Sequence, residues 1–275
     1  MSNPWIAGLV AVFVWWFSTG AILLVVKRAD QLGLRARKQA VLMGLPLLVL
    51  GIWGYMATLA TVSVAASYLA FLAVLAIWGW IELAFLAGII SGPIRKPCPP
   101  NAPEWERFLR AWGTIAFHEI LLVGMVIAIG LYGWGAENTF GMWTFFILFF
   151  ARISAKLNLF LGVPKINTEF LPSVLEHLPS HFRIRRLNWL FPISITALTF
   201  AVACWLERLW VAPSAGDVVG FSLLGAITTL ALLEHWLMVL PVPDERLWRW
   251  MLPVENGRPN NTSLIKTTRE DAHGL

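Results

Sequence analysis

The fold class is decided by the stretch VAASYLAFLAVLAIWGWIELAFLAGII, residues 64–90, which is apolar apart from a few small polar side chains and one charged residue, Glu82. A helix needs about 20 apolar residues to cross the hydrocarbon core of a bilayer, so this stretch predicts a transmembrane helix. Of all 275 residues, 58% are hydrophobic and 13% are charged, whereas typical soluble domains carry roughly 25% charged residues. This composition excludes a soluble globular protein, and it also excludes a largely disordered one.

Apolar runs of similar length recur on both sides of this stretch. The predicted spans cover residues 5–26, 40–60, 64–90, 108–134, 141–161, 189–210 and 217–240. We therefore predict an all-α integral membrane protein with about seven transmembrane helices. Residues 1–252 form a single polytopic transmembrane helical domain in this prediction, with cytoplasmic links at 91–107 and 162–188, and residues 253–275 form a polar cytoplasmic tail.

The basic residues alternate along the chain, which has a net charge of +5. Lys and Arg are frequent in the links after the first, third and fifth spans and in the tail, and they are absent from residues 61–63, 135–140 and 211–216. Cytoplasmic loops of membrane proteins carry an excess of Lys and Arg. This pattern predicts an N-terminus outside and a cytoplasmic C-terminus. The positive charge is then a topology signal, and we expect no nucleic-acid partner.

Two of the links have a distinctive composition. Residues 91–106 contain five prolines, which exclude a regular helix there. Residues 162–186 are long enough for a short amphipathic helix at the membrane surface, with Leu171, Leu175 and Leu178 on one side. His177 and His181 would share a face of such a helix, although Pro179 lies between them, and we expect them to be surface histidines at the headgroup level.

Ionisable residues inside the spans are costly, and each marks a possible functional site. Their distances from the span ends, at about 1.5 Å per residue, place them roughly 5–15 Å below the cytoplasmic surface. The polar residues at this depth are Glu82, His118, Glu119, Arg152, Lys156, Asn158, Glu234 and His235. We predict that they form one buried polar cluster that is open to the cytoplasmic side.

Four interpretations of this cluster remain open, of which proton translocation is the least favoured. The charges could simply neutralise one another and fix the order of the helices. The cluster could bind a tetrapyrrole, with His118 or His235 as axial ligand to its metal and with Arg152, Lys156 and Asn158 as the polar groups around it. It could also bind one or two iron or zinc ions as in a metalloenzyme. The candidate metal ligands are Glu82, His118, Glu119, Glu234 and His235. Adjacent His-Glu and Glu-His pairs differ, however, from the Glu-x-x-His pattern of di-iron helix bundles.

Several stretches of the sequence resemble the photosynthetic complex assembly protein 2 family, also called PuhE. They are WWFSTGAIL (15–23), WGWIELAFLAGIISGPIRKPCP (78–99), FHEI (117–120), ARISAKLNLFLGVP (151–164), EFLPSVLEHLPSHFR (169–183) and LLEHWLMVLPVPDERLWRW (232–250). The likeness covers about residues 10 to 252, and the combination of these motifs is specific.

The resemblance implies a multi-pass protein of the bacterial cytoplasmic membrane, inner or intracytoplasmic, in a phototroph. It implies a role in assembling the photosynthetic reaction centre and light-harvesting complex or in supplying (bacterio)chlorophyll, with subunits of those complexes as partners. It supplies no catalytic residues. The alternative is a membrane metalloenzyme, with iron or zinc, that acts on a hydrophobic pigment or a quinone.

Overall fold

The computed structural model describes residues 2–166, 168 and 171–242. Within them, seven helices are long and apolar enough to span a membrane, which confirms the predicted number, because α2 and α3 together count as one span. The elements are α1 (Pro4–Leu32), α2 (Leu34–Met43), α3 (Leu45–Thr58), α4 (Val64–Leu86), α5 (Glu104–Gly133), α6 (Phe140–Leu161), η1 (Ser173–Leu175), η2 (Leu178–His181), α7 (Leu190–Trp210) and α8 (Ala215–Leu237). The predicted tail at 253–275 lies outside the described residues.

Glycines set two helix ends that differ from the predicted ones. The second span begins as a helix at Leu34 rather than at residue 40, directly after Gly33, whose φ of 89° separates α1 from α2. The third span ends at Leu86 rather than at residue 90. Gly88 has a φ of 69°, and its N–H donates to the carbonyl of Phe85, which is the left-handed glycine end common in helices. Such helix ends cannot be predicted from hydropathy alone, because they depend on the backbone conformation of single glycines.

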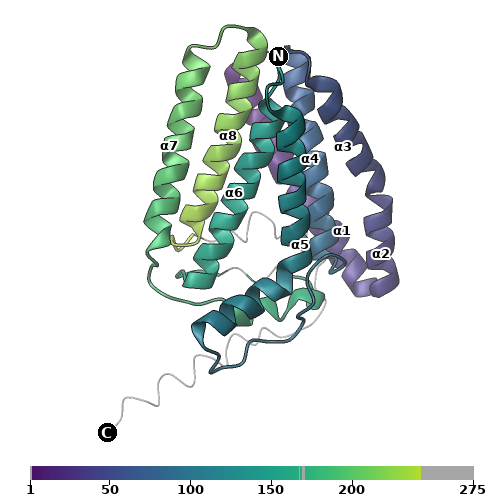
Figure 1. Cartoon of the computed structure of the whole chain (residues 1–275), viewed down its shortest axis with the longest axis vertical. Coiled ribbons are helices and arrows are strands. Elements are labelled where there is room, and N and C mark those ends of the chain that lie inside the picture. Colours follow the sequence, from purple (N-terminus) through teal and green to yellow (C-terminus); the bar gives the residue numbers. More distant parts are fainter. Residues whose placement is uncertain (1, 167, 169–170, 243–275) are drawn as a thin grey trace.

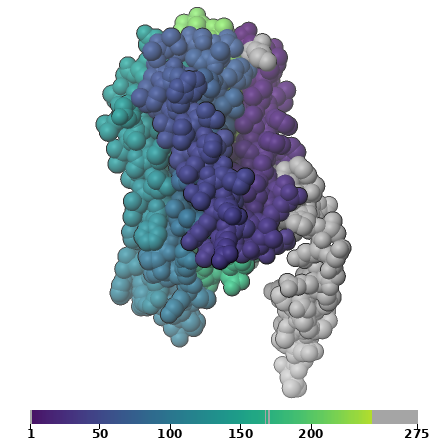
Figure 2. All heavy atoms as spheres, turned by 90° about the vertical axis from the view of Figure 1, so that its right-hand side faces the viewer, coloured from purple at the N-terminus to yellow at the C-terminus, as the bar shows by residue number. Residues whose placement is uncertain are grey.

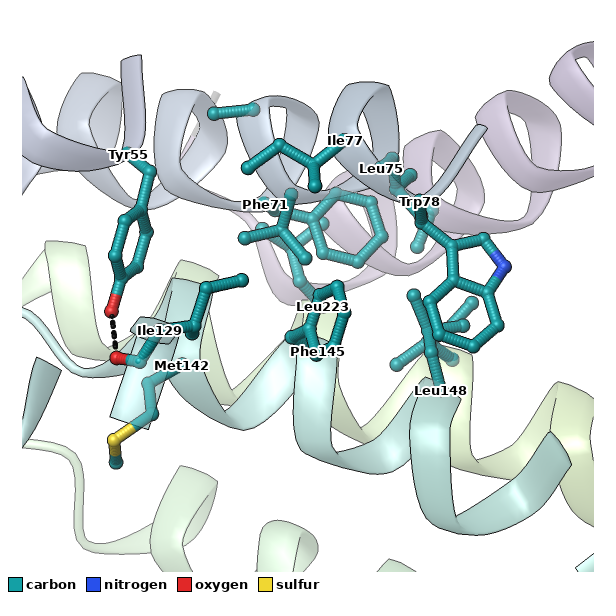
Figure 3. Packing of buried hydrophobic residues seen from close by; sticks show 14 of the residues in the cluster. Tyr55, Phe71, Leu75, Ile77, Trp78, Ile129, Met142, Phe145, Leu148 and Leu223 are labelled. Atoms are coloured by element: carbon teal, nitrogen blue, oxygen red, sulfur yellow. Dashed lines mark hydrogen bonds between the residues drawn. The ribbon is translucent and has the colours of Figure 1, made fainter. Parts of the chain in front are cut away.

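Helices α4, α6 and α8 contact one another and form the centre of the bundle. Around them, α3 packs on α4, α7 on α8, α5 on α6, and α1 on both α8 and α4 (Figure 1). Figure 2 shows α2 and α3 covering one side of the bundle next to α1. Large side chains such as Phe71 of α4, Phe145 of α6 and Leu223 of α8 fill the centre (Figure 3). The hydroxyl of Tyr55 donates a 2.7 Å hydrogen bond to the carbonyl of Ile129 and ties α3 to α5.

The links α1–α2, α4–α5 and α6–α7 lie at one end of the bundle, the lower end in Figure 1. These links and the helix turns beside them carry most Lys and Arg residues of the described chain, and we call this the basic end. The N-terminus lies at the opposite end, where the three short links contain neither Lys nor Arg.

Helix α5 bends because the proline-rich link inserts into its hydrogen-bond ladder. The carbonyl of Ser91 accepts hydrogen bonds from the backbone N–H groups of Phe117 and His118, at 3.1 and 3.3 Å. The N–H of Ile94 donates to the carbonyl of Gly113 at 3.1 Å. An insertion of this kind is a usual cause of a sharp helix kink. The first turns of α5 therefore lie across the basic end, and only the later turns run along the bundle (Figure 1).

The link between α6 and α7 differs from its prediction. Instead of an amphipathic helix it contains the two short 3₁₀ helices η1 and η2. Leu175 and Leu178 pack against Phe85 of α4, and His177 and His181 are only 6% and 1% exposed. The expectations of a membrane-surface helix and of surface histidines were therefore wrong. Pro172 and Pro179 keep the helical turns short, and the leucines find apolar partners inside the protein rather than in lipid.

Side chains of neighbouring elements hold this link in place. Asp30, near the end of α1, accepts hydrogen bonds from the backbone N–H and the hydroxyl of Ser173, at 2.9 and 3.0 Å. The guanidinium of Arg107 donates to the carbonyl of His181 at 2.7 Å. The link is thus docked on three helices, α1, α4 and α5.

Candidate functional site

A cavity of about 740 Å³ lies within the half of the bundle nearer the basic end. Ligand sites typically have volumes of roughly 300–1,000 Å³. Its walls come from α1, α4, α5, α6 and α8, and the α6–α7 link contributes residues including His181 and Phe182. Helix α1 crosses the back of the bundle in Figure 1 and α5 lies at its front, so the cavity extends between the central helices. Residues of the link line it on the side of the basic end.

The cavity wall combines aromatic side chains with charges. Trp15, Trp78, Phe85 and Trp112 are among its aromatic members. The charged members within the described residues are Glu82, Glu119, Arg152, Lys156 and Glu234. The structure thus brings these five polar residues from different spans together around one cavity.

Two ion pairs cross the cavity wall. Arg152 donates to the carboxylate of Glu82 at 2.9 Å, and the ammonium group of Lys156 forms a close ion pair with Glu119. The two cations are one turn apart on α6, so they share a face. They reach two different helices, α4 and α5. Helix α6 is thus bound electrostatically to both neighbours at the same depth.

The two histidines of the predicted cluster lie beside the cavity rather than in its wall. His118 is 0% exposed, its ring lies 4.3 Å from the ring of Phe85, and its Nε2 is 3.9 Å from Glu82 Oε1. Neither of its ring nitrogens has a hydrogen-bond partner among the described residues. The Nδ1–H of His235 donates to the carbonyl of Ala231 at 2.8 Å, and its Nε2 lies 2.9 Å from the Ser154 hydroxyl. His118 is therefore the better placed of the two for ligating a metal.

Asn158 joins helices instead of facing the cavity. Its amide nitrogen donates to the carbonyl of Ser154 at 2.9 Å and to the hydroxyl of Ser194 on α7 at 3.0 Å. Its backbone carbonyl accepts a 3.3 Å hydrogen bond from the side-chain amide of Asn188. Sequence depth placed Asn158 at the right level, but only the rotation of α6 decides which way it points.

In the part of the chain that the structure describes, no group of three or more His, Cys, Asp or Glu side chains is placed to hold a metal ion. Glu82 and Glu119, two of the predicted metal ligands, instead bind cations of α6. This arrangement gives no support to the metalloenzyme interpretation.

Several residues of the cavity wall were not among the predicted site residues. Trp15, Ser18 and Thr19 of α1 line the cavity, and so does His181 of the link. In α1, the adjacent hydroxyl side chains of Ser18 and Thr19 within an apolar span could have indicated that this helix contributes to a polar site. No local pattern indicated that His181 folds back into the bundle.

The docked link is expected to lose stability in mild acid. Burial lowers the pKa of both His177 and His181 below the ordinary value of 6.5, and nearby Arg95, Arg107 and Arg110 act in the same direction. The unfolded chain therefore takes up protons below about pH 6.5 that the folded chain excludes, so the free energy of unfolding falls as the pH drops through this range. Thermal unfolding in detergent at about pH 7.5 and about pH 5.5 measures this. A His177→Gln/His181→Gln variant is expected to show a flatter pH dependence, and an unchanged slope would contradict the assignment.

Comparison with known proteins shows the family to which the chain belongs. The chain is 55% identical over 253 residues to a protein of Rhodobacter capsulatus described as "Uncharacterized 30.4 kDa protein in puhA 5'region", and the match covers 92% of each chain. No solved structure matches the chain. The family model described as "Protein of unknown function (DUF3623)" matches residues 1–258, and the chain therefore belongs to the DUF3623 family.

Proposed function

We propose that this protein is a membrane assembly factor for the bacterial photosynthetic reaction centre and light-harvesting complex, and that it handles (bacterio)chlorophyll or a precursor. The observation that carries the proposal is the 740 Å³ cavity, whose aromatic wall contains charged side chains at membrane depth. The relative in the puhA 5' region supports a photosynthesis-related role. The resemblance to the photosynthetic complex assembly protein 2 family supports the assembly role.

The residues present suit a flat, amphipathic pigment. Trp15, Trp78 and Phe85 offer apolar ring faces. The side chain of Arg152 is 36% exposed and can donate hydrogen bonds to a carbonyl or carboxylate of the pigment. His118 keeps both ring nitrogens without a partner among the described residues, but it is fully buried and does not line the cavity, so it would reach a pigment metal only after its ring turns into the cavity. The bound pigment would supply light absorption and would be transferred rather than transformed.

The seven membrane-length helices and the bacterial relative are consistent with a bacterial membrane protein. We propose that the membrane is the cytoplasmic membrane, inner or intracytoplasmic, and that the basic end faces the cytoplasm. Anionic lipids attract basic segments by about 1 kcal/mol per Lys or Arg near the surface. The same face would meet subunits of the assembling complex.

Deletion of the gene in a phototrophic host tests the proposal. We expect a several-fold loss of the near-infrared absorbance bands of the assembled complexes, which the full chain supplied on a plasmid restores. Unchanged bands in the deletion strain would refute the assembly role. Protein purified in mild detergent from the restored strain is expected to carry a tetrapyrrole absorbance band, and folded protein without such a band would refute the pigment part.

A further inference from the structure

The charges of the cavity do not balance. Among the described residues that line it, three carboxylates face two cations. Arg152 binds Glu82 and Lys156 binds Glu119, so Glu234 is the carboxylate without a cation bound to it in the described chain. An uncompensated charge within a bundle at membrane depth is costly. The cavity therefore presents a carboxylate without a bound cation to a ligand that enters it.

Glu234 is also accessible. It lies on α8 one turn before the helix ends, it lines the cavity, and it is exposed, whereas its neighbour His235 is buried. Trp15 on α1 lines the same cavity. A carboxylate has about four sites that accept hydrogen bonds. Glu234 therefore retains accepting capacity toward the cavity.

Arg152 provides the complementary group. Its Nη2 donates to Glu82, its Nε has no partner among the described residues, and its side chain is 36% exposed. A guanidinium carries five N–H donors. Arg152 and Glu234 line the same cavity, and no ion pair joins them among the described residues. The cavity thus presents an acceptor on α8 and a donor on α6.

We infer that Glu234 holds an electropositive centre of the ligand, either ring N–H groups or a bound divalent metal, while Arg152 binds a carbonyl or carboxylate at the ligand's edge. This inference rests on the proposed function and narrows its ligand class. A quinone carries acceptors alone and cannot donate a hydrogen bond to the carboxylate of Glu234, so we expect quinones to bind more weakly than ligands with an electropositive centre. The apolar remainder of the ligand packs on Trp15 and Trp78, which line the same cavity.

Tryptophan fluorescence of the full chain in detergent tests the inference, because Trp15, Trp78 and Trp112 line the cavity. The probes are free-base protoporphyrin IX, zinc protoporphyrin IX and decylubiquinone. We expect saturable quenching by at least one porphyrin and no displacement by decylubiquinone. A hydrogen bond to a charged group is worth about 1.5–3 kcal/mol, so Glu234→Gln is expected to weaken porphyrin binding about 10-fold or more. Glu207→Gln, at an exposed position of α7, is the matched control and is expected to bind like wild type.

Tighter binding of free-base protoporphyrin IX would indicate that Glu234 holds ring N–H groups. Tighter binding of zinc protoporphyrin IX would indicate that it holds the bound metal. Equal affinity of Glu234→Gln and wild type, equal competition by decylubiquinone, or no porphyrin binding by wild type would each overturn the inference. If Glu234→Gln does not fold, Glu234→Asp serves instead, because it keeps the negative charge but shortens the side chain. Porphyrin binding by Glu234→Asp as tight as that of wild type would also overturn the inference. The experiment with the deletion strain does not depend on these probes. A negative binding result therefore leaves the proposed assembly role standing, and an unchanged deletion strain leaves the binding result standing.

Discussion

Lys156→Met is expected to destabilise the protein by about 3–5 kcal/mol, because it leaves Glu119 as a buried carboxylate without its cation. The side chains of Lys156 and Glu119 are 19% and 10% exposed, so water has little access to the carboxylate of Glu119 once its cation is removed. The free energy of unfolding in mixed micelles, measured by denaturing-detergent titration, checks this expectation.

The double variant Glu119→Gln/Lys156→Met removes both charges together. Replacing a buried ion pair by neutral groups of similar volume is often neutral or stabilising. We therefore expect the double variant to be far more stable than Lys156→Met alone. The control is Glu207→Gln/Arg208→Met on α7, where both side chains are 66% exposed and little change is expected. If Lys156→Met and the double variant were equally unstable, the ion pair would not be the source of the effect.

Gly92→Ala is expected to push the proline-rich link out of α5. A Cβ at this position would lie 2.2 Å from the carbonyl oxygen of Gly113 and 2.6 Å from the carbonyl carbon of Thr114, which are backbone atoms and cannot turn aside. Overpacking costs about 1–3 kcal/mol, and each lost backbone hydrogen bond adds about 1 kcal/mol. Since the carbonyl of Ser91 accepts two such bonds, we expect a loss of several kcal/mol in the same titration.

Gly124→Ala is the control within the same helix, because nothing lies within 4 Å of its added Cβ. Alanine favours a helix interior over glycine by about 1 kcal/mol, so this variant is expected to be as stable as wild type or slightly more stable. Wild-type stability of Gly92→Ala would contradict the close approach of the link to α5.

The helices could be predicted from the sequence because the length and apolarity of a span are local properties. The shared depth of Glu82, Glu119 and Arg152 could be predicted for the same reason, since each residue lies a countable number of turns from a span end. Which carboxylate binds which cation could not, because that depends on how each helix is rotated about its axis. His235 and Asn158 illustrate this limit, since they have the expected depth but point between helices.

The α6–α7 link could not be predicted because its environment is tertiary. The sequence around Leu175 and Leu178 fits a surface helix that faces lipid as well as a segment that packs on Phe85. The second arrangement depends on contacts with residues distant in sequence, such as the hydrogen bonds of Ser173 to Asp30 and of Arg107 to the carbonyl of His181.

The two ion pairs of α6 also have a consequence for the order in which the chain is made. A ribosome synthesises Glu82 and Glu119 before Arg152 and Lys156, so both acids are in the membrane when the cations arrive. A charged residue at the centre of an inserting helix costs roughly 2.5–3.5 kcal/mol. A carboxyl group can avoid that cost by carrying a proton until its partner arrives, whereas a guanidinium cannot lose its charge. With the acids on the earlier helices, Glu82 is already in the membrane when Arg152, whose charge cannot be removed, enters it, and a chain with these two signs exchanged would insert the permanent charge first.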